Sequence, residues 1–121
     1  AVESHPGAVA DAQFNIEAAN VDNIQVIEGD VGRVLADLER PIQAAVVDPP
    51  RSGCGAEVIK QLVSLRLERL VYVACDPATL ARDAKILSSS GYRLEEIQPI
   101  DLFPQTYHIE SVGLFLRDSP V

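Results

Sequence analysis

The sequence predicts an α/β fold with a mostly parallel sheet that ends in an antiparallel hairpin. Two observations predict it. Short apolar runs rich in β-branched residues alternate with helical patterns over residues 1–90, as in a parallel sheet with connecting helices. Residues 92–100 and 111–117 are two further strand patterns with no helix between them, which is typical of a closing hairpin. The composition, 47% hydrophobic and 23% charged, is that of a globular domain.

The first helix is expected to begin at Ser4, which can act as its N-cap, with Pro6 in the first turn. Residues 1–3 before it are typical of the end of a strand. The helix should end near Asn20, and four residues form its apolar stripe at spacings of three and four: Val9, Ala12, Ile16 and Ala19. The chain therefore enters the domain with a strand and an amphipathic helix.

The middle of the chain continues the alternation. A short strand over 24–28 and a weak helix over 32–38 precede a strand over 43–47, which the prolines at 49 and 50 stop. A helix over 56–65 follows, with these side chains directed inward: Val58, Ile59, Leu62 and Val63.

The stretch around Cys75 organises the second half of the chain. Residues 70–74 are typical of a buried strand, and Asp76-Pro77 are the usual N-cap and first residue of a helix, which runs to about Ser89 before Gly91. Cys75 therefore lies at the carboxyl edge of the sheet, where α/β folds bind ligands. The adjacent helix N-terminus favours a thiolate.

Two further polar clusters follow or precede strands at the same edge, at residues 48–51 and 108–110. Each cluster alone has a structural explanation, because a cysteine after a buried strand commonly packs and Asp-Pro-Pro is a common turn. Three clusters at one edge indicate a functional site.

Charge and cysteine content limit the function classes. The net charge is -8, and residues 1–50 hold nine acidic residues against two basic ones, so no general nucleic-acid surface is predicted and any RNA contact must be local. Two cysteines make neither a disulfide framework nor a four-ligand zinc site, and we expect a cytoplasmic protein without a metal. No apolar run approaches the roughly 20 residues of a membrane span. Met is absent, which suggests a piece of a longer chain.

Three motifs carry a resemblance to a known family: VDPPRSG at 47–53, YVACDPATLARD at 72–83 and DLFPQTYHIE at 101–110. Their order and spacing resemble the S-adenosylmethionine-dependent RNA uracil-C5 methyltransferases, which act on ribosomal and transfer RNA. The resemblance implies a Rossmann-like class I methyltransferase sheet. It also implies that residues 1–121 are the later part of a catalytic domain, lacking the first strand and its glycine-rich loop.

The resemblance also implies roles for individual residues. Cys75 would be the nucleophile that adds to C6 of uracil, and Glu110 the base that removes the C5 proton. Glu3, Asp30 and Asp48 would bind S-adenosylmethionine. The substrate uridine would meet Asp48 and three further residues: Pro49, Arg51 and His108.

The chain departs from the family at two places. Asp76 stands where the family usually has Asn after the cysteine; it still caps the helix, but its charge opposes thiolate formation at Cys75. The glycine-rich loop should precede Glu3. Without the strand that carries it, we expect unpaired sheet edges, weak cofactor binding, and a chain that forms a homodimer or exchanges strands.

The chemistry needs these residue types independently of the resemblance. C5 of uracil is a poor nucleophile, and thiolate addition at C6 activates it by splitting one hard step into easier ones. Two alternatives stay open from the residues alone. An amino-group methyltransferase would use Asp48-Pro-Pro without any thiol, and a non-enzymatic flavodoxin-like module would use acidic strand ends, although the lysine expected near its last strand is missing.

Overall fold

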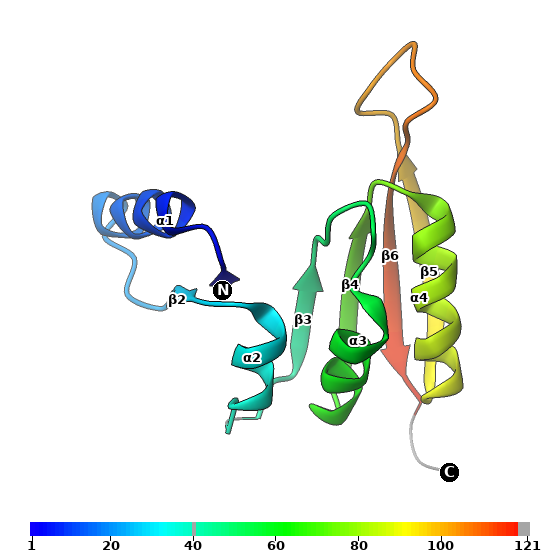
Figure 1. The fold of residues 1–121 in the computed structure, drawn as a ribbon, viewed down its shortest axis with the longest axis horizontal. Coiled ribbons are helices and arrows are strands. Elements are labelled where there is room, and N and C mark those ends of the chain that lie inside the picture. Colours follow the sequence, from blue (N-terminus) through cyan, green and yellow to red (C-terminus); the bar gives the residue numbers. More distant parts are fainter. Residues whose placement is uncertain (40, 119–121) are drawn as a thin grey trace. The chain divides into compact units, whose positions relative to one another are not determined.

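The computed structural model describes residues 1–39 and 41–118. It divides into two compact units, the first formed by Ala1–Glu39 and the second beginning after residue 40. Each unit has its own small sheet, and each is described by itself (Figure 1).

The first unit contains a two-stranded parallel sheet and two helices. The order along the chain is β1 (Val2–Glu3), α1 (Pro6–Ala18), β2 (Ile27–Glu28) and α2 (Val31–Ala36). Val2 pairs with Ile27 and Glu3 with Glu28, so both strands finish at the same edge. This is the strand–helix alternation that the sequence predicts.

Three details of the first unit correct the sequence prediction. The N-cap of α1 is His5, not Ser4; the imidazole Nδ1 accepts a hydrogen bond from the amide of Ala8 at 3.3 Å. The strand expected over 24–28 is reduced to β2, because only Ile27 and Glu28 pair with β1, and Ile24 is 51% exposed. Of the predicted stripe on α1, only Val9 is buried.

The second unit contains a four-stranded sheet in the order β3-β4-β6-β5. β3 pairs with β4 in parallel, whereas β4 pairs with β6 and β6 with β5 in antiparallel fashion. The predicted closing hairpin is therefore confirmed, with its second strand placed beside β4. The elements run as follows: β3 (Ala44–Val47), α3 (Gly55–Ser64), β4 (Arg69–Ala74), α4 (Pro77–Ser89), β5 (Tyr92–Ile100) and β6 (Glu110–Arg117).

The core of the second unit lies between α3, α4 and one face of the sheet. Figure 1 shows both helices on the same face. In β4 and β6, the two central strands, buried residues alternate with less buried ones, as in a sheet covered on one face. Val58 and Val63, predicted to point inward, are only half-buried. The buried apolar residues of this unit are Ile59, Leu62, Leu67, Leu70, Tyr72, Ala74, Leu80, Leu87, Tyr92 and Phe115.

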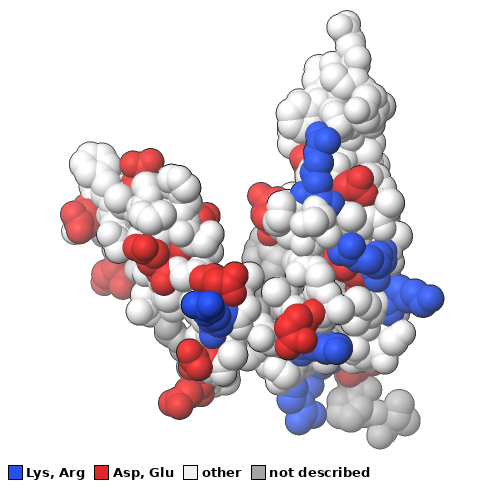
Figure 2. Space-filling model, in the orientation of Figure 1, with Lys and Arg blue, Asp and Glu red and all other residues white. Residues whose placement is uncertain are grey.

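The surface charge differs between the units. In Figure 2 acidic side chains spread over the first unit, whereas most Lys and Arg side chains lie on the second. The connection between β5 and β6 projects beyond the sheet (Figure 1), and Asp101 is its one charged residue over 101–109. Over residues 1–39 and 41–118, no helix combines the length and apolarity required to cross a membrane.

Candidate active site

Three predicted site residues meet at one edge of the second sheet. Asp48 follows the last residue of β3, Cys75 follows the last residue of β4, and Glu110 is the first residue of β6. Ala74 pairs with Ser111 at the end of the β4–β6 ladder. Cys75 and Glu110 therefore occupy the next pair of facing positions, one residue beyond the Ala74–Ser111 pair, on two adjacent antiparallel strands.

Cys75 is half-buried, with a free thiol, immediately before the N-cap of α4. The cap is made by Asp76, whose Oδ1 accepts a hydrogen bond from the Thr79 amide at 2.9 Å. This hydrogen bond, with a smaller electrostatic contribution from Arg51, holds the pKa of Asp76 below its ordinary value. The cap fixes the backbone beside Cys75.

Arg51 connects the loop after β3 to the β5–β6 connection. Its Nη2 lies 3.2 Å from Nδ1 and 3.3 Å from Nε2 of His108, so it can donate to the ring nitrogen that carries no proton. The imidazole also contacts two aromatic rings, with centroids 4.3 Å away for Tyr107 and 6.3 Å away for Phe103. His108 is two residues from Glu110, so this contact ties the predicted substrate-binding residues to the β6 strand end.

Asp48 and Pro49 open the loop that leads to Arg51. Asp48 is exposed and Pro49 half-buried. The amide of Gly53 donates to the carbonyl of Pro50 at 2.8 Å, which closes a turn in this loop. The carboxylate of Asp48 is therefore presented at the sheet edge by a short, internally bonded loop.

Glu3 and Asp30 lie together at the edge where the two strands of the first unit end. Glu3 is paired with Glu28, and Asp30 follows two residues later as the N-cap of α2. Glu3 Oε1 accepts from the His5 amide at 2.7 Å, and Asp30 Oδ1 accepts from the Arg33 amide at 3.2 Å. Both residues are exposed. A carboxylate has about four acceptor positions, so each can accept further hydrogen bonds from ligand hydroxyl or amino groups.

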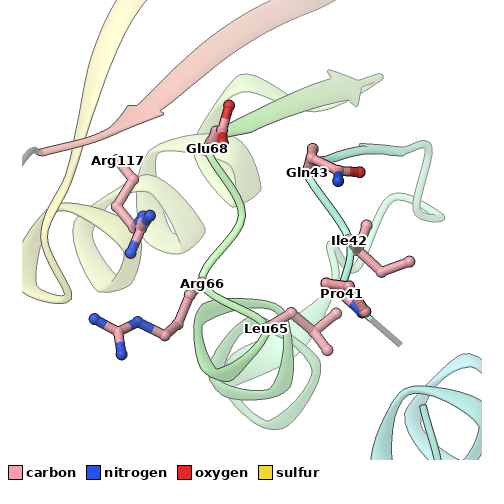
Figure 3. A pocket seen from close by; sticks show the side chains of 7 residues that line it. All are labelled: Pro41, Ile42, Gln43, Leu65, Arg66, Glu68 and Arg117. Carbon is pink, nitrogen blue, oxygen red and sulfur yellow. The ribbon is translucent and has the colours of Figure 1, made fainter. Parts of the chain in front are cut away.

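A surface depression of the second unit lies at the other end of the sheet. It is bordered by residues that precede β3 and β4, and Figure 3 shows the side chains of Arg66 and Arg117 on it. Ligands of α/β sheets bind outside the carboxyl ends of the strands, whereas this depression is at the amino ends of β3 and β4. We therefore place the candidate site at the Cys75 edge. The depression is lined by Pro41, Ile42, Gln43, Leu65, Arg66, Glu68 and Arg117.

Asp83, for which the sequence predicts no role, lies at the centre of a buried hydrogen-bond network. Its side chain is fully buried and accepts from Tyr72, Arg82 and the amide of Cys54. The signal was present in the sequence. Asp83 lies three residues after Leu80 and four before Leu87, so a carboxylate occupies the apolar face of the helix.

The network predicts how stability depends on pH. Burial raises the pKa of the Cys54 thiol, and burial together with the hydrogen bond to Asp83 raises the pKa of Tyr72. In the unfolded chain the Cys54 thiol loses its proton at about pH 8.5 and the Tyr72 hydroxyl at about pH 10, while the folded chain still holds both protons. The folded state then binds more protons, so the free energy of unfolding falls as pH rises above about 8.5.

Urea unfolding between pH 7 and pH 10.5 measures this decline. Cys54→Ser should remove the decline in the free energy of unfolding that begins at about pH 8.5. The decline that begins at about pH 10 should remain. A free energy of unfolding that stays constant or rises over this range contradicts the prediction.

Comparison with solved structures identifies the class of fold. The tRNA (uracil-54, C5)-methyltransferase of Pyrococcus abyssi, in complex with S-adenosyl-L-homocysteine, superposes with a TM-score of 0.83 and 34% identity, over 95% of this chain and 28% of that one. NSun6 from Pyrococcus horikoshii has a TM-score of 0.78 over 99% of this chain and 41% of its own, and at 15% identity this likeness concerns the fold alone. The predicted Rossmann-like methyltransferase fold is confirmed.

Sequence comparison identifies the family. Residues 34–119 match the family model of tRNA (uracil-5-)-methyltransferases. An uncharacterized RNA methyltransferase of Caldanaerobacter subterraneus is 45% identical over 119 residues, and one of Thermotoga maritima is 43% identical over 116; each match covers 96% of this chain and 26% of the relative. The chain belongs to the tRNA (uracil-5-)-methyltransferase family. It spans about a quarter of the length of these curated relatives.

Proposed function

We propose that residues 1–121 are part of the catalytic domain of a cytoplasmic RNA (uracil-C5)-methyltransferase. The enzyme transfers a methyl group from S-adenosylmethionine to C5 of a uridine in transfer or ribosomal RNA. The observation that supports this most is the strand register, which sets Cys75 and Glu110 at the same level on adjacent strands. The family of the chain and the two unpaired cysteines agree with it.

Cys75 and Glu110 divide the reaction between them. The Cys75 thiolate adds to C6 of the uracil, which forms a sulfur–carbon bond and shifts an electron pair toward C5. S-adenosylmethionine, when bound, supplies the electrophilic methyl group that C5 takes up. The Glu110 carboxylate then removes the C5 proton, and the electron pair restores the C5–C6 double bond and expels the thiolate. The uridine gains a methyl group and loses one proton, and Cys75 is regenerated.

The remaining predicted residues would hold the two ligands. The exposed carboxylates of Glu3 and Asp30 fit the hydroxyl and amino groups of the ribose and adenine of S-adenosylmethionine. Asp48 would lie beside the cofactor and the target base, and Pro49 shapes its loop. Arg51 and His108 would present a cation and an aromatic ring to the RNA, whose phosphates and bases such groups bind.

A label on the C5 hydrogen tests the proposed reaction. The complete polypeptide that the gene for this sequence encodes is incubated with S-adenosylmethionine and RNA carrying tritium at C5 of uridine. We expect one tritium released to water for each methyl group transferred, because C5 must lose its hydrogen. Methylation without tritium release would contradict the proposal and favour an amino-group methyltransferase.

We further propose that a polypeptide of these 121 residues self-associates through β3. Among the described residues this strand pairs with β4 alone, and Val46 on it is 71% exposed. A strand with an unpaired edge is a template for a second chain. Sedimentation velocity should detect a homodimer at micromolar concentration. This homodimer should bind S-adenosylmethionine weakly.

Val46→Lys should weaken this dimer about tenfold, because an edge lysine opposes strand pairing. The matched control is Val31→Lys, at a 39% exposed position of α2, which should leave the dimer unchanged. A monomer that binds cofactor tightly with one-to-one stoichiometry would contradict this proposal.

A further inference from the structure

We propose that Asp83 is a positioning residue for the reaction: it clamps the loop after β3 in the place that the candidate site needs. The clamp consists of Asp83, Tyr72, Arg82 and the backbone of residues 52–54. This inference rests on the proposed function, since it assigns a role to the loop that carries Asp48 and Arg51.

Every donor of the clamp is directed at one fully buried carboxylate. Asp83 Oδ2 accepts from the Tyr72 hydroxyl at 2.7 Å and from the Cys54 amide at 2.9 Å. Asp83 Oδ1 accepts from both Arg82 Nε at 2.9 Å and Arg82 Nη2 at 2.8 Å, so a single carboxylate oxygen lies in the fork of the guanidinium. Both Asp83 and Tyr72 are 0% exposed. Such charge-assisted bonds define the position of each donor closely.

The loop is held by hydrogen bonds on both sides of Gly53, at Ser52 and at Cys54. Arg82 Nη2 also donates to the carbonyl of Ser52 at 2.7 Å, and the Cys54 amide donates to both Asp83 and Tyr72. Between them Gly53 has φ +78°, and a Cβ there would lie 2.5 Å from Arg82 Nη2 and 2.7 Å from Asp83 Oδ2. The backbone approaches the clamp so closely that only glycine fits.

The clamp joins the segments that carry the candidate site. Tyr72 is on β4, three residues before Cys75, and Asp83 is on the helix that begins just after it. The clamped loop extends back to Arg51, which contacts His108 near Glu110. A shift of residues 52–54 would therefore move Arg51 relative to both Cys75 and Glu110.

A buried carboxylate is a poor choice where stability alone is needed, and here its ion-pair partner Arg82 is 51% exposed. Position 83 lies on the same buried face of α4 as Leu80 and Leu87. An apolar residue there could pack without a desolvation cost. Burial raises the pKa of Asp83, but the hydrogen bonds from Tyr72, Arg82 and Cys54 lower it by more, so the carboxylate is charged at neutral pH. The charged carboxylate orients the three groups that donate to it, which are the Tyr72 hydroxyl, the Arg82 guanidinium and the Cys54 amide.

Two tyrosines provide a matched test. Tyr72→Phe removes the hydroxyl of the clamp. Tyr92→Phe removes an equally buried hydroxyl, which donates to the Leu67 carbonyl at 2.9 Å and is outside the clamp. In the complete gene product we expect both variants to lower Tm, Tyr72→Phe by more because its hydroxyl donates to a charged carboxylate. Only Tyr72→Phe should lower kcat, by about tenfold or more, with KM for S-adenosylmethionine within about twofold of the wild type. Asp83→Asn should lower kcat further.

Equal effects of the two tyrosine variants on kcat would overturn the proposal, because the network would then be a stabilising element only. Amide hydrogen exchange gives a readout that needs no activity. Asp83→Asn should accelerate exchange at Cys54 more than at residues of α3 and β6, and uniform acceleration would overturn the clamp. If the wild type transfers no methyl group to C5, the proposed function fails, and exchange at Cys54 still decides whether the clamp exists.

Discussion

Replacing Cys75 by alanine is expected to abolish methyl transfer to C5, with a loss of about 10⁴-fold or more in kcat. The physical reason is that C5 becomes nucleophilic only after a group has added to C6, and covalent nucleophiles of enzymes commonly contribute this much or more. The measurement is single-turnover methylation of the RNA by the complete gene product. Cys75 is half-buried at a loop junction, so the substitution should cost little stability.

Cys75→Ser is the control that keeps the size and shape of the side chain at position 75. It changes only sulfur to oxygen, and it should be as inactive as the alanine variant because a hydroxyl is a far weaker nucleophile at neutral pH. Both variants should bind S-adenosylmethionine and unfold as the wild type does. A Cys75→Ala variant that retains a tenth of the wild-type rate would show that the reaction proceeds without this thiol.

Replacing Glu110 by glutamine is expected to stop the reaction one step later. Methyl transfer to C5 can still occur, but the C5 proton has no base to receive it, so the bond between Cys75 and C6 persists. We expect kcat to fall about 10²- to 10⁴-fold, the usual contribution of a general base. Denaturing electrophoresis should show a covalent protein–RNA complex that contains the transferred methyl group.

Glu96→Gln is the matched control for this variant. Glu96 is an exposed carboxylate on β5, the strand that pairs with β6, and its loss should change kcat by less than about twofold. A Glu110→Gln variant that releases its product normally, without a covalent complex, would contradict the assignment of the base.

The second unit was predictable because its signals are local and strong. Asp76-Pro77 specified the start of α4, and the structure confirms that start with the Asp76 cap. Strand ends followed from Pro49 and Pro50 and from the apolar run before Cys75. Since the carboxyl ends of parallel strands meet at one edge, the grouping of Asp48 with Cys75 followed from chain order alone.

The first unit and the clamp were less predictable, for physical reasons. Ser4 has the commoner capping side chain, but His5 occupies the position from which an acceptor reaches the Ala8 amide. Only the two residues of β2 pair with β1, and this pairing depends on a separate part of the chain, not on the residues of β2 alone. The role of Asp83 depends on Tyr72 and Cys54, which are distant in sequence and meet only in the fold.

The most direct test of the account is the reaction with RNA in which the target uridine carries fluorine at C5. Fluorine does not leave as a proton does, so the bond between Cys75 and C6 should be trapped after methyl transfer. We predict one RNA bound per enzyme, and mass spectrometry of the digested complex should place the methylated, fluorinated nucleotide on the peptide that contains Cys75. Methylation of ordinary RNA by an enzyme that forms no such adduct, or an adduct on another residue, would contradict the account.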